Sequence, residues 1–381
     1  MDYYFTYSKI FLSTLGQWPY QSRLIAKICQ YFWTMQHISI MIPEAIKLYE
    51  YRKNIDLVIE CLPNLLYNAG IGVKFINGVI NQHKIKLALE KVKQDWNKVQ
   101  NNHEQIKILQ DFSDSGRLLI IFYIGFVYFV LLSFMFIPLS PIILDFINPL
   151  NETRPKSPLY IAEFFVDQDK YYYSILMHGY VTSLFGILPL FGNDIFLSNC
   201  VHHACGMFTI LGHRLKKQLS KENVDGDEIY KQTIDCVVQH QRIIEFCDDV
   251  NKIYSTSFFF VLTICIIMMS VTGVVAVIKL EENFKDCFRF AMFTIAQIFH
   301  MLCYNLLGQK LLNQGEKFSN YIWESNWYLA SRKTKFIIQF IVFRSSKPAN
   351  LQANIFPLSL ENFTSVMKTS MSYFTVFKST R

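Results

Sequence analysis

Long apolar runs alternate with shorter charged segments along the whole of this 381-residue chain. A run of about 20 apolar residues is long enough to cross a bilayer as a helix. The pattern predicts six such spans and a seventh, weakly apolar one at the end of the chain. The predicted spans are residues 28–46, 58–80, 118–137, 171–193, 253–278, 290–309 and 358–377. We therefore predict an all-α polytopic membrane protein with seven transmembrane helices.

The charged segments between the spans also show helical spacing. Residues 83–117 place Leu87, Val92, Trp96 and Val99 on one side, which predicts a single helix leaving the membrane. Helices are likewise predicted to continue span four through residue 219, to precede span five over 228–251, and to form a basic amphipathic helix over 332–344. Residues 139–170, with four prolines, predict a loop.

Composition agrees with a membrane protein. Apolar residues make up 51% of the chain and charged residues only 18%, with 34 Phe and 21 Tyr. The first 21 residues lack the apolar core of a cleavable signal peptide, so we expect the first span to act as the membrane signal. The nine cysteines form no CxxC pair and predict no zinc site or disulfide framework. One pairing, Cys61 with Cys287, stays open.

The placement of lysine and arginine predicts the orientation. If the N-terminus is cytosolic, the cytosolic segments hold 23 of the 37 basic residues, as the positive-inside rule requires. The glycosylation sequon at Asn151 then falls in the outside loop between spans three and four. We expect a cytoplasmic N-terminus and an extracellular C-terminus, the reverse of a G-protein-coupled receptor.

The last predicted span is rich in hydroxyl groups. On a helix, one face carries Ser365, Thr369, Ser372, Val376 and Ser379. The other face carries Phe363, Val366, Ser370, Phe374 and Phe377. A hydroxyl face can line an aqueous pore, or it can form a Ser/Thr packing seam with neighbouring helices. The residues alone favour neither interpretation over the other.

The end of the chain resembles the insect odorant receptor family. The resemblance is carried by Tyr321, Trp327-Tyr328, Phe343-Arg344, Lys347-Pro348, the run Phe356-Pro-Leu358-Ser-Leu360-Glu-Asn-Phe363, and the terminal run Ser370-Met-Ser-Tyr373-Phe-Thr-Val376-Phe-Lys378. These motifs occupy about sixty residues, and the predicted topology extends the likeness loosely over the rest. Met371 departs from the terminal motif. The length resembles that of a tuning receptor, because the family's co-receptor has a long inserted loop.

The resemblance implies an odorant-gated, non-selective cation channel subunit in the plasma membrane of an olfactory neuron dendrite or cilium. Such subunits form mixed tetramers with the odorant co-receptor subunit and open to cations when a small volatile ligand binds. Residues 1–319 would hold spans one to six, with the odorant pocket in their outer half. Residues 320–381 would hold a cytosolic anchor helix and the pore-lining seventh helix.

The same resemblance assigns candidate pore residues. Val376 matches the family's hydrophobic gate position, with Tyr373 and Phe377 beside it, and an apolar ring can close a pore by dewetting. Ser379 takes the place of a Gln in the co-receptor. The full candidate set for pore and gate is Ser365, Thr369, Ser372, Tyr373, Val376, Phe377 and Ser379. Lys378, next to Ser379, would place a positive charge beside a cation pathway, which is unfavourable for cation permeation.

Candidate ligand residues follow from the chemistry of odorants, which asks for aromatic and aliphatic walls with few polar groups. The candidates lie in the outer halves of spans two to six. They are Tyr67, Ser133, Phe134, Phe136, Tyr172, Tyr173, Leu176, Met177, Tyr180, Met268, Thr272, Phe293, Thr294 and Gln297. His178, His300 and Asn305 also lie within spans, where hydrogen bonding between helices is favoured over ligand contact.

Other functional classes find little support. Gly70-Ile-Gly72 lacks the third glycine of a dinucleotide loop, and no GxSxG or HExxH motif occurs, so we predict no enzyme and no cofactor. Cys200, His202, His203 and Cys205 fall on different sides of a helix, which argues against a metal site. The basic loops carry no nucleic-acid motif. The remaining alternatives are a G-protein-coupled chemoreceptor, with its N-terminus outside, and a gustatory-type channel subunit, with a different terminal motif.

Overall fold

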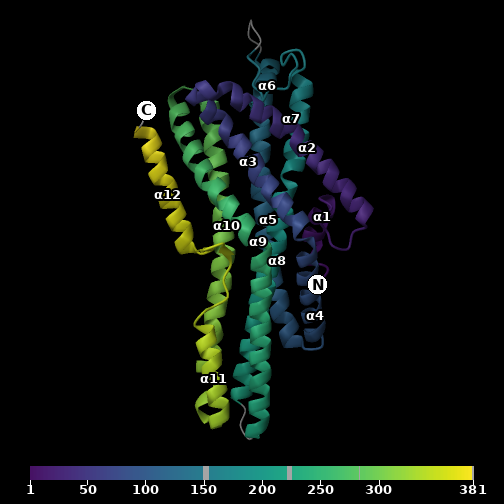
Figure 1. Ribbon diagram of the computed structural model, residues 1–381, viewed down its shortest axis with the longest axis vertical. Helices are drawn as coiled ribbons and strands as arrows, with labels where there is room; N and C mark the ends of the chain where they lie inside the picture. Colours follow the sequence, from purple (N-terminus) through teal and green to yellow (C-terminus); the bar gives the residue numbers. More distant parts are fainter. Residues whose placement is uncertain (149–153, 221–224, 283, 380–381) are drawn as a thin grey trace.

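The computed structural model describes residues 1–148, 154–220, 225–282 and 284–379, which form an elongated bundle of helices (Figure 1). The helices are α1 Thr6–Thr14, α2 Arg23–Glu50, α3 Ile55–Ile80, α4 Gln82–Val99, α5 His103–Phe136, α6 Ser140–Ile147, α7 Tyr172–Gly186, α8 Leu188–Leu219, α9 Gly226–Glu282, α10 Phe284–Trp323, α11 Arg332–Ser345 and α12 Leu360–Ser379. Short 3-10 turns cover Tyr51–Lys53, Ile137–Leu139 and Trp327–Leu329. Strands β1 Gln352–Ala353 and β2 Phe356–Pro357 pair antiparallel.

Side chains at the helix starts explain several boundaries. Ser22, Asn54, Asn102 and Ser331 each accept a hydrogen bond from a backbone N–H in the first turn of the helix that follows. Asn102 begins α5 in this way after a turn at residues 100–102. The prediction of one helix over 83–117 is therefore wrong, because the chain reverses at this cap and forms α4 and α5 instead.

Two further predicted boundaries change. Span five and the polar helix before it are one unbroken helix, α9, of 57 residues. Span four is divided, because Pro189 lies in the first turn of α8 and α7 ends at Gly186. Four helical stretches in the described residues are long and apolar enough to cross a membrane, namely His103–Ile147, Tyr172–Leu219, Gly226–Glu281 and Phe284–Trp323. The protein is a multi-pass membrane protein.

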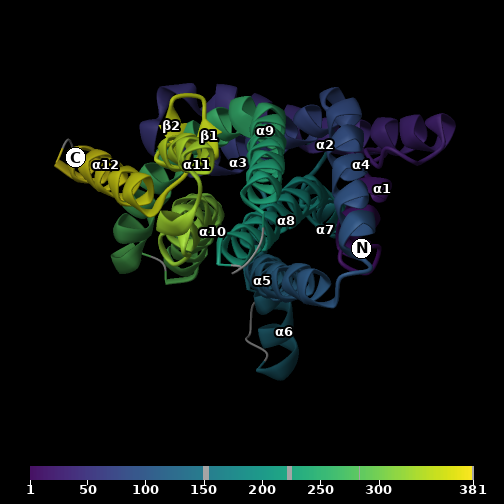
Figure 2. The ribbon, with the colours of Figure 1, turned by 90° about the horizontal axis from the view of Figure 1, so that it is seen from below.

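The two ends of the bundle differ. One end, which we call the anchor end, is made by α4, α11 and the adjoining parts of α9 and α10; the other, the loop end, carries α6 and the segment between α6 and α7 (Figure 1). The helix α8 runs through the middle, and every residue from Pro189 to Gly206 is buried. The helix α12 lies at the edge of the bundle, as the view from below shows (Figure 2).

The predicted loop over 139–170 is partly ordered against the bundle. It contains α6, and the chain after it returns so that Leu159 and Ala162 are buried. Lys47 of α2 donates a hydrogen bond of 2.9 Å to Glu163, which holds the pKa of that carboxyl below its usual range. Asn151, the predicted glycosylation site, lies outside the described residues.

A compact joint connects α10 to the start of α12. Asn305 Oδ1 accepts a hydrogen bond from Ser359 N, and Gln309 Oε1 accepts one from Leu360 N, both at 3.1 Å. Between them along α10, Gly308 lies so close to the backbone carbonyl of Leu358 that a Cβ there would overlap it. These contacts fix the foot of α12 against α10.

Candidate functional site

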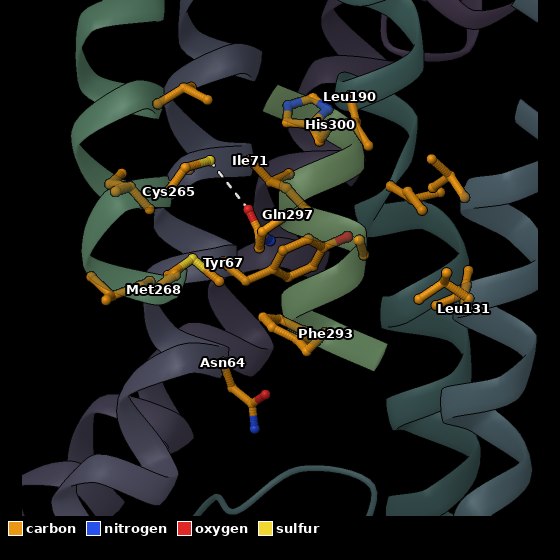
Figure 3. A pocket seen from close by; sticks show the side chains of 18 of the residues that line it. Asn64, Tyr67, Ile71, Leu131, Leu190, Cys265, Met268, Phe293, Gln297 and His300 are labelled. Carbon is orange, nitrogen blue, oxygen red and sulfur yellow. Dashed lines mark hydrogen bonds between the residues drawn. The ribbon is translucent and has the colours of Figure 1, made fainter. Parts of the chain in front are cut away.

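A cavity of about 110 Å³ lies between α3, α5, α8, α9 and α10, on the loop-end side of the bundle's middle (Figure 3). This volume is several times the roughly 10–15 Å³ that one water needs, so the cavity can hold a small organic molecule. Its apolar walls are Leu66, Gly70, Ile71, Val127, Val130, Leu131, Phe134, Ile187, Leu190, Val261, Ile264, Met268, Phe293 and Ala296. Its other lining residues are Asn64, Tyr67, Lys74, Tyr160, Cys265, Gln297 and His300.

Aromatic side chains shape the cavity. The rings of Tyr67 and Phe293 meet edge to face with centroids 5.6 Å apart. Tyr160, from the segment between α6 and α7, packs on Phe134 with ring centroids 5.8 Å apart. The Tyr160 hydroxyl also lies 2.6 Å from Ser183 Oγ of α7. The loop end thus contributes a wall of the cavity and is tied to α5 and α7 there.

A buried ion pair closes the side of the cavity nearest the anchor end. Lys74 Nζ of α3 lies 2.8 and 2.9 Å from the two carboxylate oxygens of Asp194 of α8. Its other hydrogen-bonding partners are His300 Nε2, at 3.2 Å, and the hydroxyl of Tyr304. Tyr123 of α5 donates to Asp194 Oδ2 at 2.6 Å. Four helices, α3, α5, α8 and α10, therefore meet at one polar cluster.

The hydrogen bonds of this cluster define the form of His300. Because Lys74 can only donate, His300 Nε2 must accept its hydrogen bond. His300 Nδ1 therefore carries the proton and donates to the Tyr123 hydroxyl, 3.0 Å away, whose own hydrogen is given to Asp194. Every donor of Lys74 and both ring nitrogens of His300 are used inside the protein. The positive charge of Lys74 is therefore compensated by Asp194 without a ligand.

Five of the predicted ligand residues line the cavity: Tyr67, Phe134, Met268, Phe293 and Gln297. Leu176 and Tyr172 line a separate cavity of about 100 Å³ nearer the loop end. The other seven lie outside both cavities: Ser133, Phe136, Tyr173, Met177, Tyr180, Thr272 and Thr294. Thr294 donates to Thr272 at 2.7 Å, and Tyr180 donates to the Met135 carbonyl at 2.9 Å, so these groups hold helices together.

Sequence reasoning missed several lining residues. On α3, Asn64 lies three residues before Tyr67, and Ile71 and Lys74 lie four and seven residues after it, so they share its face. On α10, His300 shares the face of Phe293 and Gln297 in the same way. Extending the helical spacing from the chosen residues would have found them. Tyr160 gave no such signal, because it belongs to a loop.

The predicted pore face of α12 is open to the outside of the subunit. Ser365, Thr369, Ser372, Tyr373 and Val376 are all exposed, and Val376 is 56% exposed. Val366 and Ser370 of the opposite face are buried, and the Ser370 carbonyl accepts a hydrogen bond from Ser270 of α9. The side chains of Phe377, Lys378 and Ser379 lie outside the described part of the chain.

Two further features bear on the open face. Thr369 and Ser372 donate to the carbonyls of Ser365 and Lys368, so their hydroxyls are satisfied within the helix. Lys368 itself is exposed and lies on the same face, since it is three residues after Ser365 and four before Ser372. A lysine inside a membrane helix usually faces water or a charged partner.

Other polar groups within the spans are used in packing. His203 lies 3.3 Å from Asp95, and His202 contacts the Ser198 carbonyl at 2.7 Å. Cys200 and Cys205 are buried free thiols. The remaining cysteines are also free, including Cys61 and Cys287. Among the described residues no group of His, Cys, Asp and Glu side chains has the arrangement of a metal site.

The remaining polar and charged groups also contact neighbouring helices. His178 lies 2.9 Å from Ser39 of α2. In the anchor end, Asp249 pairs with Lys91 at 2.7 Å and with Lys252 at 3.2 Å. Asp249 thus ties α9 to α4 in the anchor end.

Comparison with known proteins gives a consistent picture. A family model described as 7tm Odorant receptor matches residues 54–371. Putative odorant receptor 92a of Drosophila melanogaster is 24% identical over 188 residues, which are 49% of this chain and 45% of that protein. Odorant receptor 13a of the same organism is 25% identical over 258 residues, which are 63% and 61% of the two chains. The matching segments thus span less than two thirds of either relative.

Solved structures with the same fold exist. The olfactory receptor OR5 from Machilis hrabei, in complex with eugenol, superimposes with a TM-score of 0.82 at 15% identity, over 100% of this chain and 98% of that one. A second structure of OR5 from the same organism gives a TM-score of 0.77 at 16% identity, over 99% of each chain. The fold of the whole described chain is therefore that of an insect olfactory receptor.

Proposed function

This chain belongs to the 7tm Odorant receptor family, and from that premise we propose that it is an odorant-gated, non-selective cation channel subunit. Its ligand would be a small, largely apolar molecule bound in the cavity between α3, α5, α8, α9 and α10. The observation that carries this proposal is the mainly apolar cavity of about 110 Å³, walled by Tyr67 and Phe293. The family match leaves no reason to pursue a G-protein-coupled or gustatory-type receptor.

The helix α10 offers a physical route from ligand to pore. It lines the cavity with Phe293, Gln297 and His300, and it fixes the foot of α12 with Asn305 and Gln309. Residues 293 and 309 are about 24 Å apart along a helix, within one rigid element. A ligand that favours a slightly different position of α10 would therefore move the start of α12 as well.

For the pore, we propose that the open face of α12 lines a central pathway in a tetramer. The set comprises Ser365, Thr369, Ser372, Tyr373, Val376, Phe377 and Ser379, with Val376 as the hydrophobic gate. What supports this is the exposure of the first five in the single subunit, since an exposed face with a lysine is a poor surface for lipid. The packing-seam alternative would bury the same face against a neighbouring helix.

The finer assignments follow the same proposal. The subunit would be a tuning receptor that assembles with the odorant co-receptor subunit in the plasma membrane of an olfactory neuron dendrite or cilium. The anchor end would be cytosolic, and the loop end, with Asn151, extracellular. The ligand residues would be Tyr67, Phe134, Met268, Phe293 and Gln297, with the other predicted positions acting indirectly through helix packing.

The decisive experiment is a current recording from cells that express the full chain with and without a co-receptor, across a panel of volatile compounds. We expect ligand-evoked, non-selective cation currents with the co-receptor. A protein that reaches the cell surface together with the co-receptor and yet responds to no compound would overturn the proposal. Epitope tags at each terminus, probed on intact cells, test the orientation separately.

A further inference from the structure

Some polar groups that line the cavity already have hydrogen-bond partners within the protein, and others do not. Lys74 and His300 have every hydrogen-bonding position engaged in the cluster around Asp194. The Tyr160 hydroxyl is paired with Ser183. Lys74 and His300 therefore have no free donor or acceptor for a ligand, and the Tyr160 hydroxyl already has one partner. The groups that remain are on Gln297, Tyr67 and Asn64.

The amide of Gln297 is held in one orientation. Its carbonyl oxygen accepts a hydrogen bond from the Cys265 thiol at 3.1 Å, which the dashed line in Figure 3 marks. The amide nitrogen, which can only donate, has no hydrogen-bonding partner among the described residues. Gln297 is only 8% exposed and lines the cavity, which leaves this nitrogen for a partner that lies inside the cavity. The cavity thus contains a fixed donor that lacks an acceptor.

Two neighbouring groups of the cavity also lack partners. Asn64 is 6% exposed, lines the same cavity, and its amide nitrogen is buried with no partner in the described part of the chain. The Tyr67 hydroxyl also forms no hydrogen bond within that part. A hydroxyl can donate or accept, but both amide nitrogens can only donate. Of the three, only Gln297 has its acceptor already used and its donor free.

We propose that Gln297 selects uncharged ligands that carry a hydrogen-bond acceptor oxygen, such as ketones, aldehydes and esters, over hydrocarbons and amines of the same shape. The apolar walls take the ligand's carbon skeleton, and the acceptor oxygen lies against the Gln297 amide. This inference rests on the proposed function, because it names the ligand class of that same cavity.

The competing ligand classes each carry a physical cost. A hydrocarbon leaves the Gln297 donor buried and unpaired when it displaces water from the cavity. A protonated amine brings a positive charge beside the Lys74 ammonium and must give up its hydration. A carboxylate finds no free cation, because Lys74 is already paired with Asp194. Only a neutral acceptor satisfies the donor without adding a charge.

Matched compounds test this directly on the full chain expressed with a co-receptor. Acetophenone, α-methylstyrene and 1-phenylethylamine share one shape and differ at one group, as do 2-heptanone, 2-methyl-1-heptene and 2-aminoheptane. We expect the ketone of at least one set to act at a concentration about 10- to 100-fold lower than its alkene and its amine. Potencies equal within about threefold in every set that evokes a current would overturn the inference.

Variants then assign the selection to Gln297. In Gln297→Leu the ketone should lose its advantage while the alkene keeps or gains potency, and Cys265→Ala should weaken the advantage by freeing the amide to turn. Gln241→Leu, at an exposed position in the anchor-end part of α9, is the matched control and should keep the wild-type ratio. A Gln297→Leu protein at the cell surface that retains the full ketone advantage would overturn the role of Gln297.

The test also separates this inference from the proposed function. Currents evoked by alkenes and amines as readily as by ketones leave an odorant-gated channel in place and overturn only the ligand class. Thermal stabilisation of the purified full chain by each compound gives a second readout that does not depend on gating. If no compound of any class evokes current or stabilises the protein, the proposed function and the inference fail together.

Discussion

Lys74 Nζ lies 2.8 Å from Asp194 Oδ1, and the two side chains are only 5% and 9% exposed. An ion pair this deeply buried is costly to split, because removing one partner leaves the other charge without compensation. The pair joins α3 to α8, and its further hydrogen bonds reach Tyr123 of α5 and His300 and Tyr304 of α10. It is therefore a structural centre of the bundle beside the cavity.

Lys74→Met should destabilise the protein by about 3–5 kcal/mol, because Asp194 would remain charged or take up a proton in a site built for a cation. Thermal unfolding of the detergent-purified chain, followed by size-exclusion chromatography, measures the effect. The double variant Lys74→Gln, Asp194→Asn removes both charges and should recover a large part of the loss. A double variant less stable than Lys74→Met would show that charge balance is not what the site requires.

Gly308→Ala should weaken the joint between α10 and α12. The added methyl group would overlap the Leu358 carbonyl, so the backbone at the foot of α12 must shift, at a cost of about 1–3 kcal/mol. Gly125→Ala is the matched control, since a Cβ there meets nothing within 4 Å. We expect impaired ligand-evoked current in Gly308→Ala at normal surface expression. Wild-type currents in that variant would separate gating from this joint.

Val376→Ala should raise the current that flows without ligand. A smaller side chain makes the proposed apolar constriction wider and easier to wet, so the closed pore leaks. Whole-cell recordings before and after ligand addition give the ratio of basal to evoked current. Basal current and ion permeability identical to those of the wild type would place the gate at another position of α12.

Lys368→Gln should increase cation conductance if the open face of α12 lines the pore. The ammonium groups of neighbouring subunits would repel permeating cations, and the effect should be largest at low ionic strength because salt screens it. Lys333→Gln, at an exposed position of α11, removes the same charge away from α12. Equal conductance of the two variants across salt concentrations would favour the packing-seam interpretation of this face.

Much of the helical order could be predicted because it depends on local patterns. Apolar runs and helical spacing located α3 and α12 to within a few residues. They also located the apolar parts of α9 and α10, although both helices extend beyond the predicted spans. The division of residues 83–117 depended on a single cap, Asn102, whose effect competes with an otherwise continuous helical pattern. The pairing of β1 with β2 was missed because two-residue strands leave almost no periodic signal.

The cavity was harder to predict than the helices. Spacing along one helix identifies a face, but it does not say which helix faces which neighbour. Tyr67 and Gln297 lie on cavity-facing surfaces, whereas Thr272 and Thr294 face each other and bond together. The Lys74–Asp194 pair joins residues 120 positions apart, so no local pattern could have linked them. Such contacts come from tertiary packing alone.

The unbroken length of α9 has a mechanical consequence. At 1.5 Å per residue, its 57 residues form a rod about 85 Å long that runs from the loop end to the anchor end. If a rod of about 85 Å rotates by about 2° around one end, its other end moves by about 3 Å. Because α9 is one continuous helix, a small tilt imposed at its loop end becomes a larger displacement at its anchor end.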